Sequence, residues 1–273
     1  DCASGVCSGG VCQAPSCSDG VRNGTETDVD CGGPGACARC PDFRLCGDAS
    51  DCMTGTCTMG VCGTIGCVPF PGRSTDSFGY FGCTVSGATL PCPDISATGT
   101  AVTLSDDSNV NVPLGFSFSY YGTTYTSVDI QSNGGVTFDP GYLTFSNSCL
   151  PRTSTPRNLV AVFWDDLNPS ISGGNVRYQT LGTAPNRQFV VRWNTALCCS
   201  GTDLAEFTMV LNEGSNDINV CYPDTVFSNA SRDSGLGATV GINGPSDSLQ
   251  YSCNTADVTN GLYIRYIHPP PGP

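Results

Sequence analysis

Cysteine is the feature that most limits what this chain can fold into, because it occurs 19 times in 273 residues. Twelve cysteines lie in residues 1–67, and the other seven lie in residues 83–253. Such density is typical of secreted chains, in which thiols pair as disulfides in an oxidising compartment. We therefore predict an extracellular or cell-surface protein in which all but about one cysteine are paired, the odd total leaving one over.

The first twelve cysteines follow a repeat. The segment CASGVCSGGVCQAPSC (2–17) aligns with CMTGTCTMGVCGTIGC (52–67), with four cysteines and a GVC triplet in register. Cys46 precedes the second copy, whereas no cysteine of this chain precedes the first. We therefore expect the chain to begin inside a repeat.

Residues 1–67 form a cysteine-rich repeat module with almost no large apolar side chains. Disulfides must take the place of a hydrophobic core in such a module, because they restrict the unfolded chain. Tetrathiolate zinc at CARC (37–40) is the alternative. We favour disulfides, because closely spaced cysteines in secreted chains normally pair.

Residues 94–268 have a different pattern, in which apolar residues alternate along short runs bounded by Gly, Asn, Asp or Pro. In VPLGFSFSY, the residues Val112, Leu114, Phe116 and Phe118 share one face. The sequence therefore predicts an all-β class with an antiparallel β-sandwich here, preceded by the loop-dominated repeat module. We expect these large residues in its core: Phe116, Phe118, Phe163, Trp164, Trp193, Phe207 and Ile264.

A Pro/Gly/Ser-rich linker is expected over residues 68–93, in which Cys83 and Cys92 close a short loop. We predict that no disulfide joins the early repeats to the sandwich, because the cysteines divide cleanly at residues 67–83. Residues 269–273, PPPGP, are expected to be a stiff proline-rich spacer.

Five more cysteines depart from a plain sandwich pattern, namely Cys149, Cys198, Cys199, Cys221 and Cys253. The adjacent Cys198 and Cys199 could bond to each other. We favour separate partners for them, such as Cys149 or Cys221, because a disulfide between neighbours is strained.

Charge excludes several classes of function. Asp and Glu number 24 against 11 basic residues, all of them Arg, so nucleic acid and anionic membranes are not expected partners. No segment is apolar for long enough to insert into a membrane. The absence of Lys excludes a Schiff-base lysine and a P-loop lysine. The one histidine, His268, excludes a His-rich metal site, and we expect it to be exposed beside the proline tail.

The segment DGVRNGTETDVDCGG (19–33) is the main candidate site. Its oxygen-bearing side chains are Asp19, Asn23, Glu26, Asp28 and Asp30. In an extended segment Glu26, Asp28 and Asp30 face one way, and calcium prefers such hard oxygen ligands. The second interpretation is a solvated turn pinned by disulfides, in which Asp19 and Asn23 cap backbone amides. Both interpretations stay open. A catalytic carboxylate pair is the weakest, because no apolar residues surround it to form a pocket.

Three weaker candidates follow. Asp165 and Asp166 in FWDDLNPS could form a calcium or sugar site at a strand end, although a turn that solvates both carboxylates is favoured. Aromatic residues that could stack on sugars, but for which ordinary packing is favoured, are Tyr121, Tyr125 and Tyr142. Asn23 and Asn229 begin N-glycosylation sequons.

Both regions also resemble known families. CSDGVRNGTETDVDCGGPGACARC, followed by the repeated cysteines, resembles a cysteine-rich repeat of large secreted and surface proteins. GFSFSYYGTTYTSVDIQSNGGVTF and FTMVLNEGSNDINVCY are similar to the nidogen-like (NIDO) extracellular domain, over about residues 108–267. The second resemblance implies a non-catalytic part of a matrix or adhesive protein, and it supplies no binding residues.

We therefore expect a non-catalytic structural or adhesive module of an extracellular surface protein, with a subunit of a surface filament or stalk as one form. Its partners would be other copies of itself or other surface proteins, with glycans as a further class. The alternative is a carbohydrate-binding module of a larger secreted enzyme. An enzyme in its own right is the least favoured, because the sequence contains no catalytic constellation.

Overall fold

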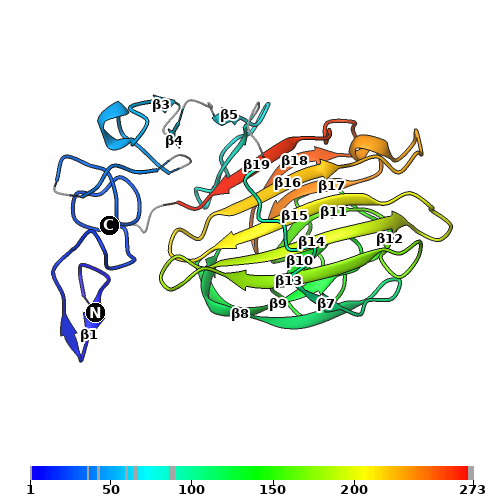
Figure 1. The fold of residues 1–273 in the computed structure, drawn as a ribbon, viewed down its shortest axis with the longest axis horizontal. Coiled ribbons are helices and arrows are strands. Elements are labelled where there is room, and N and C mark those ends of the chain that lie inside the picture. Colours follow the sequence, from blue (N-terminus) through cyan, green and yellow to red (C-terminus); the bar gives the residue numbers. More distant parts are fainter. Residues whose placement is uncertain are drawn as a thin grey trace.

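The computed structural model describes residues 2–35, 37–41, 44–58, 61–63, 67–85 and 90–269. These residues form 19 β-strands and two short 3-10 helices. Figure 1 shows a sandwich of strands with a narrow arm, residues 2–62, at one side. The predicted all-β class and antiparallel sandwich are therefore confirmed. No helix in the described part of the chain is both long and apolar enough to cross a membrane.

One layer of the sandwich is a six-stranded antiparallel sheet in the order β18-β17-β11-β10-β9-β8. Its strands are β8 (Asn109–Tyr120), β9 (Thr123–Gln131), β10 (Gly135–Thr137), β11 (Leu159–Trp164), β17 (Thr239–Asn243) and β18 (Ser248–Cys253). The alternation predicted for β8 is present, because inward residues such as Leu114 and Phe118 are fully buried while their neighbours are exposed. Strand β11 is buried on both faces.

The second layer is a nine-stranded antiparallel sheet in the order β5-β6-β19-β16-β15-β14-β13-β7, with β12 paired to β14. Its strands are β5 (Cys67–Pro69), β6 (Phe81–Val85), β7 (Thr100–Val102), β12 (Leu167–Asn168), β13 (Asn175–Leu181), β14 (Gln188–Leu197), β15 (Ala205–Asn212), β16 (Ile218–Asp224) and β19 (Leu262–Ile267). The helix η2 (Asp233–Gly235) lies between β16 and β17.

The core fills the space between the two sheets. Phe163 of β11 stacks on Phe207 of β15 with 5.4 Å between ring centroids, and Trp193 of β14 donates to the carbonyl of Gln131 in β9. All seven predicted core residues are buried. Trp164 differs from the other six, because it belongs to a separate cluster with Leu143 rather than to the main core.

The arm has little regular structure. It contains two hairpins, β1 (Cys7–Ser8) with β2 (Val11–Cys12) and β3 (Cys57–Thr58) with β4 (Val61–Cys62), together with the 3-10 helix η1 (Ala49–Asp51). Five disulfides hold these pieces together: Cys2–Cys12, Cys17–Cys37, Cys31–Cys40, Cys46–Cys57 and Cys52–Cys62. Its buried apolar cluster consists of cysteines alone.

The repeat in the sequence is also a repeat in disulfide pairing. Cys2–Cys12 and Cys52–Cys62 are equivalent bonds fifty residues apart. The partner of Cys57 is Cys46, and Cys7, which is the residue equivalent to Cys57, is an exposed free thiol.

Two disulfide predictions around the linker are wrong. Cys83 bonds to Cys67 and Cys92 bonds to Cys221, so the short loop from Cys83 to Cys92 does not form. Because β6, which contains Cys83, pairs with β19, the last repeat cysteine is bonded to a strand of the sandwich sheet. The clean division between repeat and sandwich disulfides therefore fails at Cys67.

The adjacent cysteines also differ from the favoured prediction. Cys198 and Cys199 bond to each other, and Cys149 bonds to Cys253. Cys221 lies elsewhere, paired with Cys92. Both expected partners, Cys149 and Cys221, are therefore bonded to other cysteines, and Cys198 and Cys199 form a disulfide with each other in the loop after β14.

Candidate functional site

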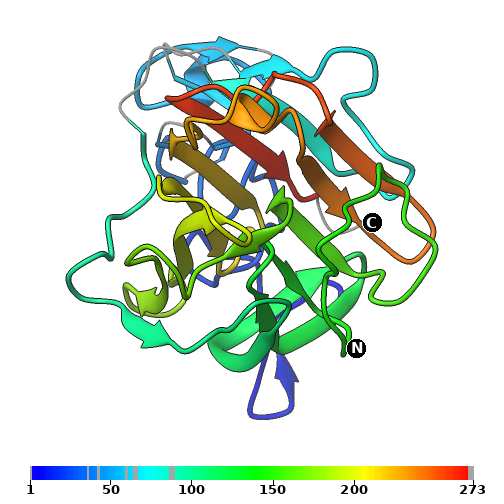
Figure 2. The same ribbon diagram turned by 90° about the vertical axis from the view of Figure 1, so that its right-hand side faces the viewer.

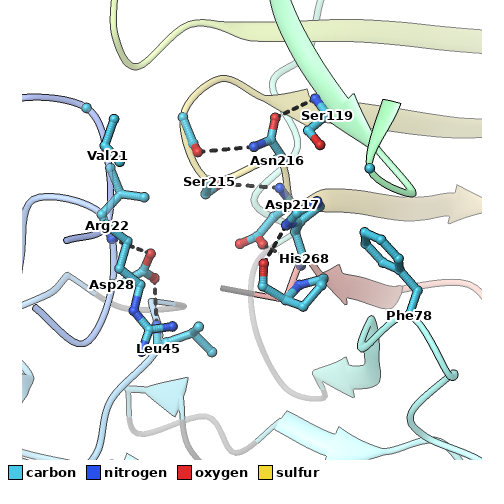
Figure 3. Close-up of a pocket in the computed structure, with 15 residues that line it drawn as sticks. Val21, Arg22, Asp28, Leu45, Phe78, Ser119, Ser215, Asn216, Asp217 and His268 are labelled. Carbon is cyan, nitrogen blue, oxygen red and sulfur yellow. Dashed lines mark hydrogen bonds between the residues drawn. The ribbon is translucent and has the colours of Figure 1, made fainter. Parts of the chain in front are cut away.

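A cleft of about 650 Å³ lies between the arm and the sandwich. The acidic loop forms one wall through Val21, Arg22 and Asp28 (Figure 3). The facing wall comes from the turn after β8, from the β15–β16 hairpin turn and from the end of the chain at His268. The fold therefore places the predicted site loop against the sandwich.

Asp19 and Asp30 act on the backbone of the loop itself. The carboxylate of Asp30 accepts hydrogen bonds from the amides of Asp19 and Gly20 at 2.9–3.1 Å. Asp19 in turn accepts from the amides of Ser16 and Val21 at 2.8 and 3.0 Å. Burial tends to raise the pKa of Asp19, but these hydrogen bonds and one from Asn23 outweigh it and lower that pKa.

Glu26 and Asp28 have similar backbone contacts. Glu26 accepts from the amide of Asn23 at 3.1 Å, and burial raises the pKa of its carboxyl. Asp28 accepts from the amide of Leu45 at 2.7 Å and forms an ion pair with Arg44 at 3.5 Å. The amide–carboxylate contacts of the loop are those of a capped turn, as in the second of the two interpretations. Two details of that interpretation are wrong, because Glu26 and Asp28 are buried rather than solvated, and Asn23 donates to Ser4 and Asp19 instead of capping an amide.

Calcium binding by this loop stays a prediction. Of the candidate carboxylate ligands in the described loop, Glu26 alone belongs to a group of three potential metal ligands whose ligand atoms lie within 4.8 Å of one another. The other two members of the group are Cys17 and Cys37. These two cysteines are bonded to each other as a disulfide. A calcium ion would therefore have to draw carboxylate oxygens away from the amides that they now accept.

The two sequon asparagines lie in different surroundings. The Nδ2 atom of Asn23 donates to the Ser4 carbonyl and to Asp19, both at 3.0 Å, inside the arm. Asn229 is exposed, and its Oδ1 atom accepts from Ser231. Of the two side-chain amides, that of Asn229 is the more accessible to modification.

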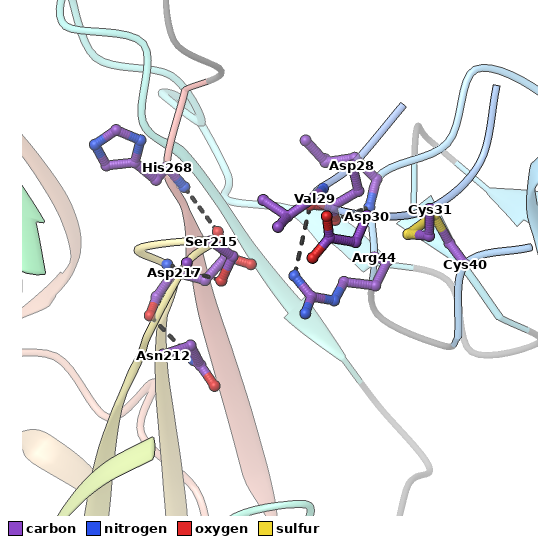
Figure 4. A network of polar contacts seen from close by, with 12 residues as sticks. Asp28, Val29, Asp30, Cys31, Cys40, Arg44, Asn212, Ser215, Asp217 and His268 are labelled. Atoms are coloured by element: carbon purple, nitrogen blue, oxygen red, sulfur yellow. Dashed lines mark hydrogen bonds and ion pairs between the residues drawn. A yellow bond between two sulfur atoms is a disulfide. The ribbon is translucent and has the colours of Figure 1, made fainter. Parts of the chain in front are cut away.

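Charged groups face one another across the base of the cleft, each paired on its own side (Figure 4). On the sandwich side, buried Asp217 pairs with Arg265 at 3.0 Å and accepts from the His268 amide at 3.0 Å. On the arm side stand Asp28 and Arg44. Burial raises the pKa of Asp217 to about 6, against the opposing charge of Arg265, and negative Asp28 raises it further.

His268 is not exposed as predicted. Its ring packs edge-on against Phe78 and Tyr80, with centroid separations of 5.8 and 5.2 Å. Burial lowers the pKa of its imidazole. Its Nδ1 atom contacts the Pro269 carbonyl at 2.6 Å, and Nε2 has no hydrogen-bond partner in the described structure. The described cleft thus contains no serine–histidine hydrogen bond of the kind that nucleophilic catalysis needs.

Asp165 and Asp166, predicted to share a solvated turn, have different environments. Asp165 is fully buried and forms an ion pair with Arg232, and burial raises the pKa of its carboxyl to about 6. Asp166 is half-buried at the edge of a second pocket. The prediction of two solvated carboxylates is therefore wrong for Asp165.

The candidate aromatic residues also differ. Tyr121 is buried, and its hydroxyl donates to Asp76 at 2.6 Å. Tyr125 is half-buried and packs on Phe138. Tyr142 alone of the three is exposed, at 51%. The three tyrosines therefore do not form a common stacking surface.

Two residues that support the cleft and the acidic loop were not identified from the sequence. Arg265 interrupts the apolar strand LYIRYI, and a charge in a buried strand indicates a buried partner, which is Asp217. Asp51 accepts from the amides of Gly33, Gly47 and Asp48, which join the acidic loop to η1. Its position three residues after Asp48 matches a capping box, a signal that the sequence does contain.

Comparison with known proteins adds one finding. A protein-family model described as NIDO related matches residues 84–271. No curated protein and no solved structure matches the chain. The match begins within β6 and covers the strands of the sandwich that follow it.

Proposed function

The chain belongs to the NIDO-related family, and from that membership we propose that it is a non-catalytic structural and adhesive module of an extracellular surface protein. In this proposal the module assembles with other copies of itself or with other surface proteins, as in a filament or stalk. The observation that carries the proposal is the joint between arm and sandwich. Strands β5 and β6 continue the large sheet, and Cys67–Cys83 fastens the last repeat cysteine to it.

Sheet edges are poor candidates for the contact surface, although unpaired edge strands commonly recruit other chains. The edges of the large sheet are β5, which is three residues long and ends in Pro69, and β7, which is also three residues long. Short edges and proline are features that oppose edge-to-edge pairing.

The edges of the smaller sheet are occupied in part by side chains. In β8 the carbonyls of Leu114 and Gly115 accept from Thr180 and Arg187. In β18 the carbonyl of Ser248 accepts from Arg73. These contacts favour the arm over a strand edge as the surface that meets a neighbour.

The tip of the arm has the chemistry of a contact surface. Val11, in the β1–β2 hairpin, is 62% exposed, and the neighbouring strand contains the free thiol of Cys7. An exposed apolar residue beside an unpaired cysteine, in a hairpin closed by the Cys2–Cys12 disulfide, suits a docking point for another subunit, covalent or not.

Light scattering and electron microscopy at physiological calcium test the proposal. We expect ordered assemblies whose contacts bury about 800 Å² or more per partner. Val11→Ser should weaken assembly, whereas Val68→Ser, which changes another exposed valine in β5, should leave it intact. Cys7→Ser should remove any disulfide-linked dimer seen on non-reducing gels. A particle that stays monomeric at all concentrations, with wild-type and both valine variants alike, contradicts the proposal.

A further inference from the structure

A second pocket, of about 340 Å³, lies at the end of the sandwich away from the arm. It is formed where β11 passes into β12, where β14 ends, and where the chain approaches η2. Figure 1 shows β12 on the side opposite the arm, and Figure 2 faces that end of the sandwich. The pocket is therefore separate from the cleft and from the proposed contact surface at the arm tip.

Polar groups that line this pocket are unused by the fold. The carboxylate of Asp166 and the hydroxyls of Ser200 and Thr202 make no side-chain hydrogen bond within the described structure. The nearby Asp233 is a contrast, because its carboxylate accepts from the amides of Phe227 and Asn229 and so shapes the loop. Asp166 thus keeps its hydrogen-bonding capacity for a molecule in the pocket.

Arg232 supplies a fixed donor on the other side of the pocket. Its guanidinium forms an ion pair with Asp165, which is fully buried and anchors it from beneath. A guanidinium has five N–H donors, and a single Nη1 contact to Asp165 leaves others for a ligand. The pocket therefore presents a carboxylate acceptor and a guanidinium donor together.

The charge of the surroundings limits the ligand. Burial raises the pKa of Asp166, and the negative charges of Asp106 and Asp107 raise it further, while Arg232 opposes them. Acidic groups outnumber basic ones here, so an anionic ligand would be repelled. A neutral polyol fits, because each of its hydroxyls can donate to a carboxylate and accept from a guanidinium.

The apolar part of the pocket lining indicates that the polyol is a sugar. Phe227 and Cys198, the latter in the Cys198–Cys199 disulfide, form an uncharged wall beside the polar groups. A sugar ring has an apolar C–H face and a rim of hydroxyls, which match such a wall and such polar groups. The volume is at the lower end of the range for ligand pockets, which suits a single ring.

We propose that this pocket binds one residue of a neutral glycan, with Asp166 and Arg232 as the polar contacts and Phe227 and Cys198 as the apolar wall. Glycan binding here does not depend on the assembly proposed above, because the pocket and the arm tip lie at opposite ends of the molecule. A failure of one proposal therefore leaves the other standing.

The experiment is a screen of neutral oligosaccharides on an array, followed by calorimetry with the best ligand. The chain should be made in a host that does not glycosylate Asn229, which lines the pocket. Asp166→Asn is the test variant, because its side chain supports no other contact and the fold should survive. Asp203→Asn is the matched control, since it removes the same charge from an exposed position one residue beyond Thr202.

We expect Asp166→Asn to weaken the affinity tenfold or more, because hydrogen bonds to charged groups are among the stronger ones. Asp203→Asn should bind like the wild type. The inference is overturned if no neutral glycan binds, or if the two variants bind equally well. It is also overturned if calcium, rather than a glycan, raises the melting temperature of the wild type and not of Asp166→Asn.

Discussion

The arm and the sandwich fix their conformations by different means. The sandwich buries a continuous cluster of aromatic and aliphatic side chains between two sheets. The buried apolar cluster of the arm consists of cysteines, and carboxylates such as Asp30 and Asp51 hold its turns by accepting backbone amides. A segment with too few apolar residues to form a core can thus be ordered by covalent bonds and backbone caps.

Reduction should separate the two regions most clearly. Each arm disulfide closes a loop of 9–20 residues, which is worth about 3 kcal/mol in the chain-entropy model. With five of them removed, we expect the arm to lose all amide protection while the sandwich keeps its own. Hydrogen exchange with mass spectrometry, with and without reductant, measures this. Equal loss in both regions would mean that the sandwich also depends on its disulfides.

A cavity in the core should destabilise the sandwich and leave the arm ordered, which is the opposite of the effect expected for reduction. Phe118 is fully buried and stacks on Phe138. Phe118→Ala should lower the free energy of unfolding of the sandwich by about 3–5 kcal/mol, because it removes apolar contact and leaves a cavity. The exposed Phe145→Ala is the control, with a change expected within about 0.5 kcal/mol. Chemical denaturation gives both values. If arm protection also falls in Phe118→Ala, the two regions unfold as one unit.

The same contrast explains which features the sequence predicted. Alternation is a local signal, and it correctly indicated β8 and the large buried residues. The repeat of cysteines is a local signal too, and Cys2–Cys12 and Cys52–Cys62 are equivalent bonds within it, although the repeat alone does not predict which cysteines pair. In both cases the residues that define the feature are close together in the chain.

The predictions that were wrong depended on contacts between distant residues. Cys92 bonds to Cys221, 129 residues away, and Asp165 is buried because Arg232, 67 residues away, neutralises it. His268 is covered by Phe78, which the large sheet brings beside it. In each case no local sequence pattern around the residue indicates its distant partner.

Acid should act in opposite directions on two buried carboxyls of the sandwich, Asp165 and Asp217, and on Asp51 of the arm. In the sandwich, Asp217 and Asp165 have folded pKa values of about 6, well above the ordinary value of 3.8. Ionising these carboxyls in the folded state therefore carries a penalty of roughly 3 kcal/mol per group at most. The penalty is absent below about pH 4, where both groups are protonated, and is fully present above about pH 6. The sandwich should become more stable as the pH falls from 7 to 4.

The pKa shifts of Asp19 and Asp51 in the arm have the other sign, whereas the pKa of Glu26 is raised. Burial tends to raise the pKa of Asp51, but hydrogen bonds from Gly47, Gly33 and Asp48 outweigh it and lower that pKa. Its contribution is present above the unfolded pKa and is lost as the pH falls below about 4. Thermal unfolding across pH 3–7 measures the sandwich, and exchange protection measures the arm. Asp217→Asn should flatten the rise between pH 7 and 4, and an unchanged slope would place its cause elsewhere.

Calcium should produce the smallest difference between the regions. Any effect would mean that the arm is ordered by a metal ion in addition to its disulfides and backbone-capping carboxylates. We expect weak binding at the loop that contains Asp28 and Asp30, with a slight stiffening of the arm, because carboxylates near one another attract a hard cation. Those carboxylates already accept amides from Leu45, Asp19 and Gly20, so binding must compete with these hydrogen bonds. Calorimetry on the wild type, Asp28→Ala and Asp30→Ala measures the binding, with Asp203→Asn as an acidic control outside the arm. If wild type and loop variants give the same heat, and chelator leaves arm protection unchanged, backbone capping alone accounts for the loop.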